Sequence, residues 1–238
     1  MNNMRFVAHI DVLGMSSLVE KDAELAWQLL SDLVSVREET HRVGIDFLDT
    51  AERVHVPDQI QTVTFSDTIV LFTKGESLKD LRSIIVVTTE FLNKALNLCI
   101  PVRAGIAFGT FFFNLDKSMY AGPALIEAYH LGEAAQWIGI TTSKEVYQRS
   151  KAANFQSGRA DVVISAPIPL KGKKQDGYAV NWPAIMATSI NAQPPLLAPQ
   201  IYEGFSQYFG PWESLPFDVK AKYENTAHFI NAHYSGQQ

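Results

Sequence analysis

The chain has 238 residues, with 20 Lys and Arg against 25 Asp and Glu, so its formal net charge is −5 and its pI is about 5.7. Hydrophobic residues make up 47% and charged residues 19%, which is typical of a globular chain and excludes disorder of the whole molecule. The acidic balance argues against a general nucleic-acid binder and against a binder of anionic membranes, because both need a basic surface. Any phosphate must therefore be held locally, by a metal ion or by a few well-placed cations.

The single cysteine, Cys99, excludes an internal disulfide and any zinc or iron–sulfur site built on thiolates. It lies in an apolar run, so we expect a thiol buried in the core. No apolar stretch approaches the roughly 18 to 20 residues of a membrane span, and no signal peptide is visible. These features predict a cytoplasmic protein without a membrane partner.

Apolar runs and helical periodicity predict six elements in the first 136 residues. In chain order they are a strand at 5–13, a helix at about 21–42, a hairpin at 59–73, a helix at 78–98, a strand at 100–113 and a helix at 122–136. The order β-α-β-β-α-β is the ferredoxin-like arrangement. We therefore predict an α+β fold with an antiparallel sheet and helices on one face.

The remaining residues predict a tail of different character. Its expected elements are a short helix at 143–150, strands at 162–169 and 178–181 around a polar loop at 171–177, a Pro-rich connector at 192–199, and helices at 201–209 and 219–234. We expect residues 1–182 to form one domain. Residues 183–238 are expected to form a connector and a helical extension packed on that same domain.

Two acids occupy positions that the predicted fold would bring together. Asp11 ends the first strand, and Asp67 lies at the tip of the hairpin, which neighbours that strand at the centre of such a sheet. Two carboxylates at short range repel unless a cation lies between them, and oxygen ligands suit magnesium or manganese. On spacing alone the alternative stays open that Asp11 is a strand-end cap and Asp67 an ordinary turn residue.

Five segments, in the right order, resemble the motifs of class III nucleotidyl cyclases. They are FVAHIDVLGM at 6–15, TFSD at 64–67, VRAGIAFG at 102–109, GPALIEAYHL at 122–131 and LKG at 170–172. The resemblance covers roughly residues 5–181. It implies a cyclase catalytic core at 1–182 and a homodimer whose two active sites are each shared between the protomers.

The resemblance also implies two divalent metal ions, Mn²⁺ or Mg²⁺, which hold a nucleoside triphosphate and activate its ribose 3′-hydroxyl. That hydroxyl would attack the α-phosphorus, and pyrophosphate would leave. The implied metal ligands are the carboxylates of Asp11 and Asp67 and the backbone carbonyl of Val12.

Substrate contacts follow from the same resemblance. Backbone N–H groups around Gly14, in the segment that includes Val12 and Leu13, would cradle phosphate. Lys171 would bind the terminal phosphates, although an ordinary lysine of a surface loop is an open alternative. Arg103 is a charged group in an apolar strand and needs a partner, so it is either a phosphate contact or a structural pair with an acid. Arg103, His130 and the metal ions are also the candidate catalytic groups that would stabilise the transition state.

Several positions depart from the family pattern. The transition-state Asn and Arg of the family fall on Ile126, which cannot donate a hydrogen bond, and on His130, which can if protonated. The Lys and the acid that read a purine edge fall on Val63 and Met119. Tyr120 replaces a usual Trp and is expected either to line the base pocket or to pack.

These departures resemble the Pycsar antiphage pyrimidine cyclases of bacteria. The resemblance implies a uridylate cyclase that makes cyclic UMP, or a cytidylate cyclase that makes cyclic CMP, and a separate effector that the product activates after phage infection. UTP is the favoured substrate. The alternatives are a purine cyclase, a degenerate non-catalytic dimer that senses a nucleotide, and a palm-type polymerase or diguanylate cyclase, whose Gly-Gly-Asp/Glu-Glu-Phe turn is absent from the sequence.

Overall fold

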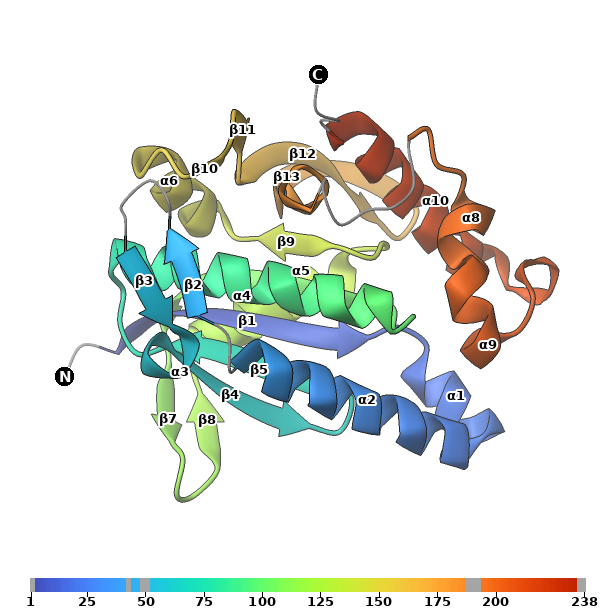
Figure 1. The fold of residues 1–238 in the computed structure, drawn as a ribbon, viewed down its shortest axis with the longest axis horizontal. Coiled ribbons are helices and arrows are strands. Elements are labelled where there is room, and N and C mark those ends of the chain that lie inside the picture. Colours follow the sequence, from blue (N-terminus) through green and yellow to red (C-terminus); the bar gives the residue numbers. More distant parts are fainter. Residues whose placement is uncertain (1–2, 42–43, 48–51, 187–193, 235–238) are drawn as a thin grey trace.

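The computed structural model describes residues 3–41, 44–47, 52–186 and 194–234. Its main sheet has seven strands in the order β12-β13-β9-β6-β1-β5-β4 (Figure 1). These strands are β1 (Met4–Val12), β4 (Ile60–Phe65), β5 (Thr68–Thr73), β6 (Val102–Thr110), β9 (Ile140–Thr142), β12 (Val163–Leu170) and β13 (Lys173–Val180). All neighbouring pairs are antiparallel except β6 and β9. The predicted α+β fold with a β-α-β-β-α-β core is confirmed.

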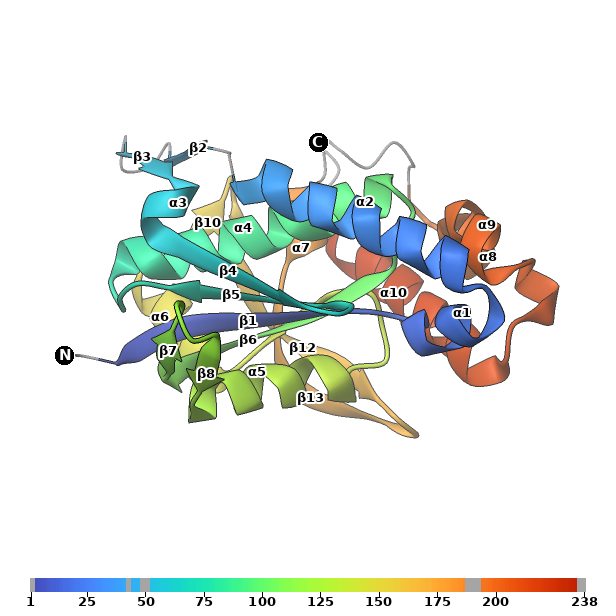
Figure 2. The ribbon, with the colours of Figure 1, turned by 90° about the horizontal axis from the view of Figure 1, so that it is seen from below.

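Helices cover both faces of this sheet, so the prediction of helices on one face is wrong. Figure 2 shows α2 (Ala23–His41) and α4 (Leu78–Asn97) above the sheet and α5 (Pro123–Ala134) below it. Along β1, Phe6 and its alternate residues join the core under α4, whereas Val7 packs with residues of α5. A strand that is apolar on both sides needs cover on both faces.

Close contact fixes α5 on β6. A Cβ atom placed on Gly105 would overlap the carbonyl oxygen of Ala128 and would lie 2.7 Å from the backbone nitrogen of Gly132. The helix can therefore lie directly on the strand because Gly105 has no side chain.

Some predicted boundaries are wrong. The helix expected at 21–42 is preceded by a separate helix, α1 (Met15–Lys21), and α2 starts only after Asp22, whose carboxylate accepts a hydrogen bond from the Leu25 amide. The polar loop expected at 171–177 belongs mostly to β13, which pairs with β12 along its whole length. The first half of β13 is exposed and polar, so its sequence lacks the apolar pattern that predicts a strand. The strand is defined by its backbone pairing with β12.

The other described elements are short. They are β2 (Gly44–Phe47), β3 (Glu52–His55), α3 (Val56–Gln59), β7 (Phe112–Asn114), β8 (Met119–Ala121), α6 (Lys144–Ala152), β10 (Gln156–Ser157) and β11 (Ala160–Asp161). The strand expected at 100–113 thus divides into β6 and β7. Residue 42 of the helix expected at 21–42, and residues 192–193 of the expected connector, lie outside the described residues.

The C-terminal segment packs on the core. It contains α7 (Trp182–Ile185), α8 (Ala198–Tyr202), the 3-10 turns η1 (Glu203–Phe205) and η2 (Trp212–Ser214), α9 (Ser206–Phe209) and α10 (Phe217–His233). The rings of Phe229 in α10 and Trp137 lie 4.6 Å apart, centroid to centroid. The Ile138 amide donates to the Thr226 hydroxyl at 2.9 Å. Within the described residues, no helix is both long and apolar enough to cross a membrane.

The cysteine is less enclosed than its apolar neighbours indicate. Cys99 is half-buried, because it lies at the turn after α4 with a φ of 57°. It borders a cavity of about 410 Å³ between α4 and the C-terminal helices. The thiol expected to be buried in the core is therefore only partly buried, against the edge of that core.

Candidate functional site

The two predicted carboxylates lie at one end of the sheet, Asp11 on β1 and Asp67 in the turn that precedes the neighbouring strand β5. Asp11, near the end of β1, is directly opposite Thr68, the first residue of β5. Asp67 is the residue before it, in the turn that joins β4 to β5, and the two negative charges interact. Ser66 makes the turn possible with a φ of 54°, a conformation that favours glycine and that a serine adopts at some cost. The structure therefore brings together the pair that the sequence predicts.

Arg103 binds Asp11 from the other neighbouring strand. Its Nη2 and Nε atoms donate to one oxygen of Asp11, at 3.1 and 3.3 Å. The same guanidinium donates to the carboxylate of Glu133 and, at 2.9 Å, to the Glu133 backbone carbonyl near the end of α5. Of the two interpretations left open for Arg103, the structure shows the pair with an acid, and it adds a second acid.

The Asp11 carboxyl group lies between opposing influences. Burial raises its pKa, the Arg103 guanidinium lowers it, and the charges of Glu133 and Asp67 raise it again, with a net pKa of about 6. Further positive charge beside this carboxyl group would favour its ionised form and lower its pKa. This property suits a group that binds a divalent cation.

Two residues of this cluster were missed by the sequence reasoning. Glu133 reaches Arg103 because α5 lies on β6. His9 is buried and lies two residues before Asp11, so both side chains point to the same side of β1. Burial lowers the pKa of the His9 imidazole. The His9 ring lies edge-on to the Tyr129 ring, with 5.2 Å between the ring centroids. The period of two from Asp11 to His9 was visible in the sequence, whereas the contact with Glu133 depends on helix packing.

The donors present fit a divalent metal ion with oxygen ligands. The Leu13 amide donates to the carbonyl of Pro101, the residue just before β6, at 2.8 Å. Since backbone groups alternate in direction along a strand, the carbonyl of Val12 points the other way, towards the turn that carries Asp67. Two carboxylates and this carbonyl are hard ligands of the kind Mg²⁺ and Mn²⁺ prefer. No group of three or more His, Cys, Asp or Glu residues able to hold a metal occurs among the described residues, so substrate oxygens or water would complete the coordination.

Gly14 follows Leu13 and is the N-cap residue of α1, which begins at Met15. Its φ is 82°, and the ring of Phe209 from α9 lies 3.0 Å from where a Cβ atom would be. The positive φ favours glycine here, and the Phe209 ring leaves little room for a side chain. Because the Leu13 amide is engaged by Pro101, the predicted phosphate cradle would use the amides of Gly14 and of the first turn of α1.

The predicted base-binding residues lie in an apolar region. Val63 on β4 and Tyr120 on β8 both pack against the smaller apolar cluster under α5. The Tyr120 ring is edge-on to Phe65 at 5.6 Å and 6.3 Å from Phe72. Tyr120 therefore packs on these rings, and its role in binding a base stays a prediction.

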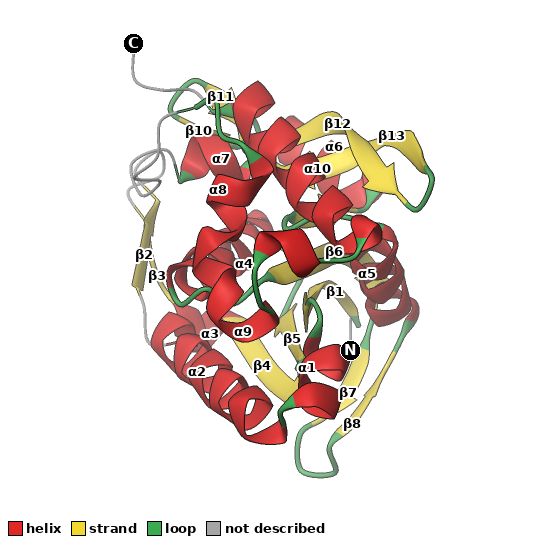
Figure 3. Cartoon of the chain, turned by 90° about the vertical axis from the view of Figure 1, so that its right-hand side faces the viewer, coloured by secondary structure: helices red, strands yellow, loops and turns green. Residues whose placement is uncertain are grey.

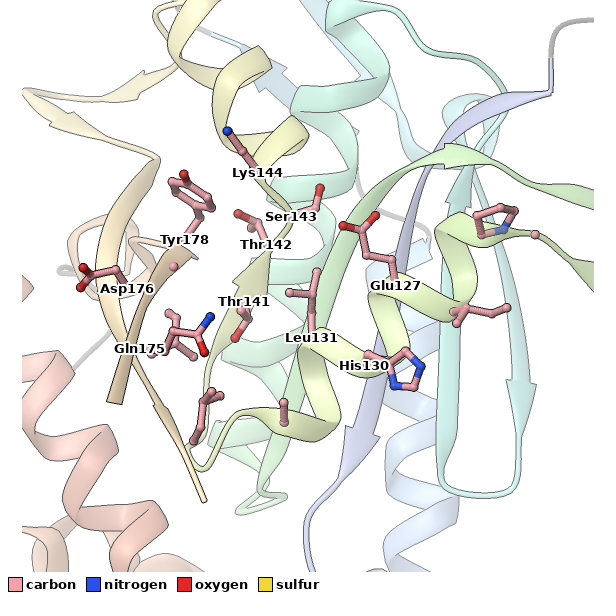
Figure 4. Close-up of a pocket in the computed structure, with 17 residues that line it drawn as sticks. Glu127, His130, Leu131, Thr141, Thr142, Ser143, Lys144, Gln175, Asp176 and Tyr178 are labelled. Atoms are coloured by element: carbon pink, nitrogen blue, oxygen red, sulfur yellow. The ribbon is translucent and has the colours of Figure 1, made fainter. Parts of the chain in front are cut away.

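Ile126 and His130 lie elsewhere, on the outer side of α5. They line a cavity of about 780 Å³ between α5 on one side and β9 and β13 on the other (Figure 4). Figure 4 shows His130 and Tyr178 on opposite walls. In the part of the chain that the structure describes, the His130 ring contacts Tyr129, not Asp11 or Asp67. The carboxylate cluster and this cavity are thus two separate regions of the described chain.

Lys171 lies in the exposed turn between β12 and β13. The turn is close to the end of α5, because Leu170 forms a bridge with Ala135 and the Gln136 amide donates to the Pro169 carbonyl at 2.7 Å. An exposed lysine fits both a phosphate contact and an ordinary surface position, so its role stays a prediction.

Comparisons with known proteins are informative at the level of the fold. No protein-family model and no curated protein sequence matches the chain. Two solved structures are similar with a TM-score of 0.46, too low to support an argument. One is a class III adenylyl cyclase-like ATP-binding protein from Pseudomonas aeruginosa, with 14% identity over 67% of this chain and 37% of that chain. The other is an adenylate/guanylate cyclase/hydrolase from Silicibacter pomeroyi, with 15% identity over 74% of this chain and 96% of that chain.

A third structure reaches a TM-score of 0.52. It is the catalytic core of a rhodopsin-guanylyl cyclase with converted specificity in complex with ATPαS, with 12% identity over 75% of this chain and 94% of that chain. The chain therefore has the fold of a nucleotidyl cyclase catalytic core.

Proposed function

We propose that this chain is a metal-dependent pyrimidine nucleotidyl cyclase of the class III family, which converts UTP to 3′,5′-cyclic UMP and pyrophosphate. The observation that carries the proposal is the pairing of Asp11 and Asp67 at the end of β1, on the fold of a cyclase core. In this reaction the 3′-hydroxyl oxygen bonds to the α-phosphorus, and the bond from that phosphorus to the pyrophosphate oxygen breaks.

Asp11, Asp67 and the Val12 carbonyl would hold two divalent ions, Mn²⁺ or Mg²⁺. Such ions would supply Lewis acidity for the hydroxyl and offset the charge of the triphosphate. Arg103 positions Asp11, because two of its nitrogens donate to the same carboxylate oxygen, Oδ2. The other oxygen, Oδ1, accepts no hydrogen bond from Arg103. This arrangement explains how a protein with a net charge of −5 can bind a triphosphate.

The separation of the carboxylate cluster from the α5 cavity supports a homodimer with composite active sites. Each of these two regions would then be a half-site, completed by the other protomer. The carboxylate cluster of one copy would face the α5 cavity of the other, so that His130 of the second copy reaches the substrate. Large apolar side chains are exposed on the end of β4, the β7–β8 hairpin and α5: Phe65, Phe112, Leu115, Met119, Ile126 and Tyr129. Exposed apolar surface favours a protein partner, and we assign this surface to a second copy.

The apolar surroundings of Val63 and Tyr120 support a pyrimidine substrate. Both pack against apolar side chains, Phe65 and Phe72 among them. Val63 and Met119 also stand where the resemblance places the Lys and the acid that read a purine edge. UTP is our first assignment and CTP, with cyclic CMP as product, is the alternative.

The exposed, apolar Ile126 favours one competing function, a nucleotide-binding dimer without catalysis, because this side chain cannot donate to a transition state. Incubation of the protein with Mn²⁺ and each of the four ribonucleoside triphosphates separates the possibilities. We expect cyclic UMP and an equal amount of pyrophosphate from UTP. Cyclic CMP or a purine product would identify a different cyclase, and the absence of product from all four would leave the non-catalytic dimer.

A role in antiphage defence, through a separate effector that cyclic UMP activates, rests on the resemblance of the motifs to Pycsar cyclases. It is tested by measuring cyclic UMP in bacteria that produce the wild-type protein or Asp67→Ala, before and after phage infection. A rise after infection in the wild-type cells alone supports the role. Equal levels in both strains would refute it.

A further inference from the structure

The C-terminal helices reach the end of the molecule where the carboxylate cluster lies. Phe209 of α9 covers Gly14, the residue expected to cradle phosphate. The side chain of Asn225 in α10 donates to the Gln136 carbonyl at 2.9 Å, and the Thr226 hydroxyl accepts from the Ile138 amide. Figures 1 and 3 show α9 near α1, and α10 packs beside α8. The extension is therefore part of the surroundings of the site.

Lys222 lies on the face of α10 that is turned to the core. The Thr226 hydroxyl donates to the Lys222 carbonyl at 2.8 Å, so the two residues are one helical turn apart on the same face. Lys222 is half-buried, and its charge interacts with those of Arg103, Glu133, Asp11 and Asp218. The next residues of this helix, Asn225 and Thr226, bond to the backbone just after Ala135, whose carbonyl accepts a hydrogen bond from Arg103. Lys222 therefore lies near the carboxylate cluster.

The ammonium group of Lys222 has no hydrogen-bond acceptor or ion-pair partner among the described residues. Burial, followed by the positive charge of Arg103, lowers the pKa of this ammonium group. A half-buried charge without an acceptor is costly, so an anion that binds beside it gains a partner at no cost to an existing bond. Arg103 cannot serve in the same way, because Asp11 and Glu133 already occupy its guanidinium.

We propose that Lys222 is a substrate-binding residue, which contacts the β- and γ-phosphates of the triphosphate and then the pyrophosphate that leaves. This inference rests on the proposed function and deepens it. A lysine offers a compact charge with three donors, which suits phosphate oxygens in several positions. The C-terminal extension would thus complete the phosphate end of the site that the core begins with Gly14.

The test uses inorganic tripolyphosphate with Mn²⁺ as the probe, and titration calorimetry as the readout. We expect the wild type to bind it, and Lys222→Met and Lys222→Gln to bind it about 10- to 100-fold more weakly, because each loses a charge-assisted hydrogen bond. Lys222→Arg should restore most of the affinity. Lys220→Met is the matched control: it lies on the same helix, but its ammonium group lies over the Trp212 ring at 5.6 Å and donates to the Glu213 carbonyl, away from the cluster.

Turnover separates this inference from the proposed function. With UTP, Lys222→Met should raise KM about 10-fold or more, whereas Lys220→Met should leave it unchanged. Equal tripolyphosphate binding by wild type and both neutral Lys222 variants would overturn the inference and leave the cyclase intact. If the wild type binds tripolyphosphate through Lys222 yet forms no cyclic product, the inference stands and the cyclase function fails.

Discussion

Asp11 shows how one residue can be placed by the fold and tuned by its neighbours. Its carboxylate accepts hydrogen bonds from Arg103, and the second acid, Asp67, lies nearby in the β4–β5 turn. Asp11 also lies on the same side of β1 as His9. The pair Asp11 and Asp67 could be predicted from sequence, because both residues end or join strands that the β-α-β-β-α-β order makes neighbours. Glu133 could not, because its contact with Arg103 depends on how closely α5 lies on β6.

The raised pKa of Asp11 gives a prediction for stability without metal. The folded carboxyl, with a pKa of about 6 against an ordinary 3.8, holds its proton more tightly than the unfolded one. Its contribution to stability is therefore present below pH 4 and is lost as the pH rises through 6. Urea unfolding should show the free energy of unfolding of the wild type falling relative to that of Asp11→Asn by on the order of 3 kcal/mol between pH 4 and pH 7.

Addition of Mn²⁺ should reverse this trend for the wild type, because the ionised carboxylate binds the metal and the proton competes with it. Asp11→Asn should show little response to Mn²⁺ at either pH. Parallel pH profiles for the two proteins without metal would show that burial of Asp11 does not govern its ionisation.

At the scale of elements, the seating of α5 on β6 decides the geometry of both half-sites. Glu133 and His130 are on this one helix, and they serve the carboxylate cluster and the cavity respectively. The sequence predicted the helix and the strand, and it showed a glycine at 105. It could not show the distance between them, which depends on the missing side chain at that position.

Gly105→Ala should therefore destabilise the protein by about 3 kcal/mol, because the new methyl group would overlap the Ala128 carbonyl and lift the helix. Gly109→Ala is a control on the same strand, where a Cβ atom would meet Ala124 at ordinary contact distances of 3.6 to 3.9 Å. We expect a change there within about 1 kcal/mol. Urea unfolding checks both, and similar losses for the two variants would contradict this view of the contact.

Other elements show why polar patterns mislead. The residues of β13 that face solvent read as a loop, and the strand forms because its backbone pairs with β12 and β9. Backbone pairing between strands leaves no mark on an exposed polar sequence. The prediction of helices on one face followed from the ferredoxin-like order of elements. The continuous apolar runs of β1 and β6 instead indicate strands that are buried on both faces, and such strands need helices on both sides of the sheet.

For the whole molecule, the main consequence of the structure is that the carboxylate cluster and the cavity beside α5 are separate in one chain. The dimer with shared sites, which the resemblance to the cyclases implies, stays a proposal, and this separation is the reason to test it. Such a dimer predicts complementation between variants that damage different half-sites.

Asp67→Ala and His130→Glu should each be inactive, the second because a carboxylate would face the triphosphate. Mixed in equal amounts, with subunits free to exchange, they should recover about a quarter of the wild-type activity, since half of the dimers carry one intact site. If the mixture stays as inactive as its components while subunit exchange is demonstrated, the composite site is wrong.

The most direct measurement is the rate at which wild type and Asp67→Ala form cyclic UMP from UTP with Mn²⁺, followed by mass spectrometry with pyrophosphate measured in parallel. Asp58→Ala, at an exposed position on α3, serves as a control for the loss of one acid. We expect product from wild type and Asp58→Ala, and a fall of roughly 1,000-fold for Asp67→Ala with the fold intact by circular dichroism. Equal rates for wild type and Asp67→Ala, or no cyclic product from the wild type, would contradict the assignment of this site to a nucleotidyl cyclase.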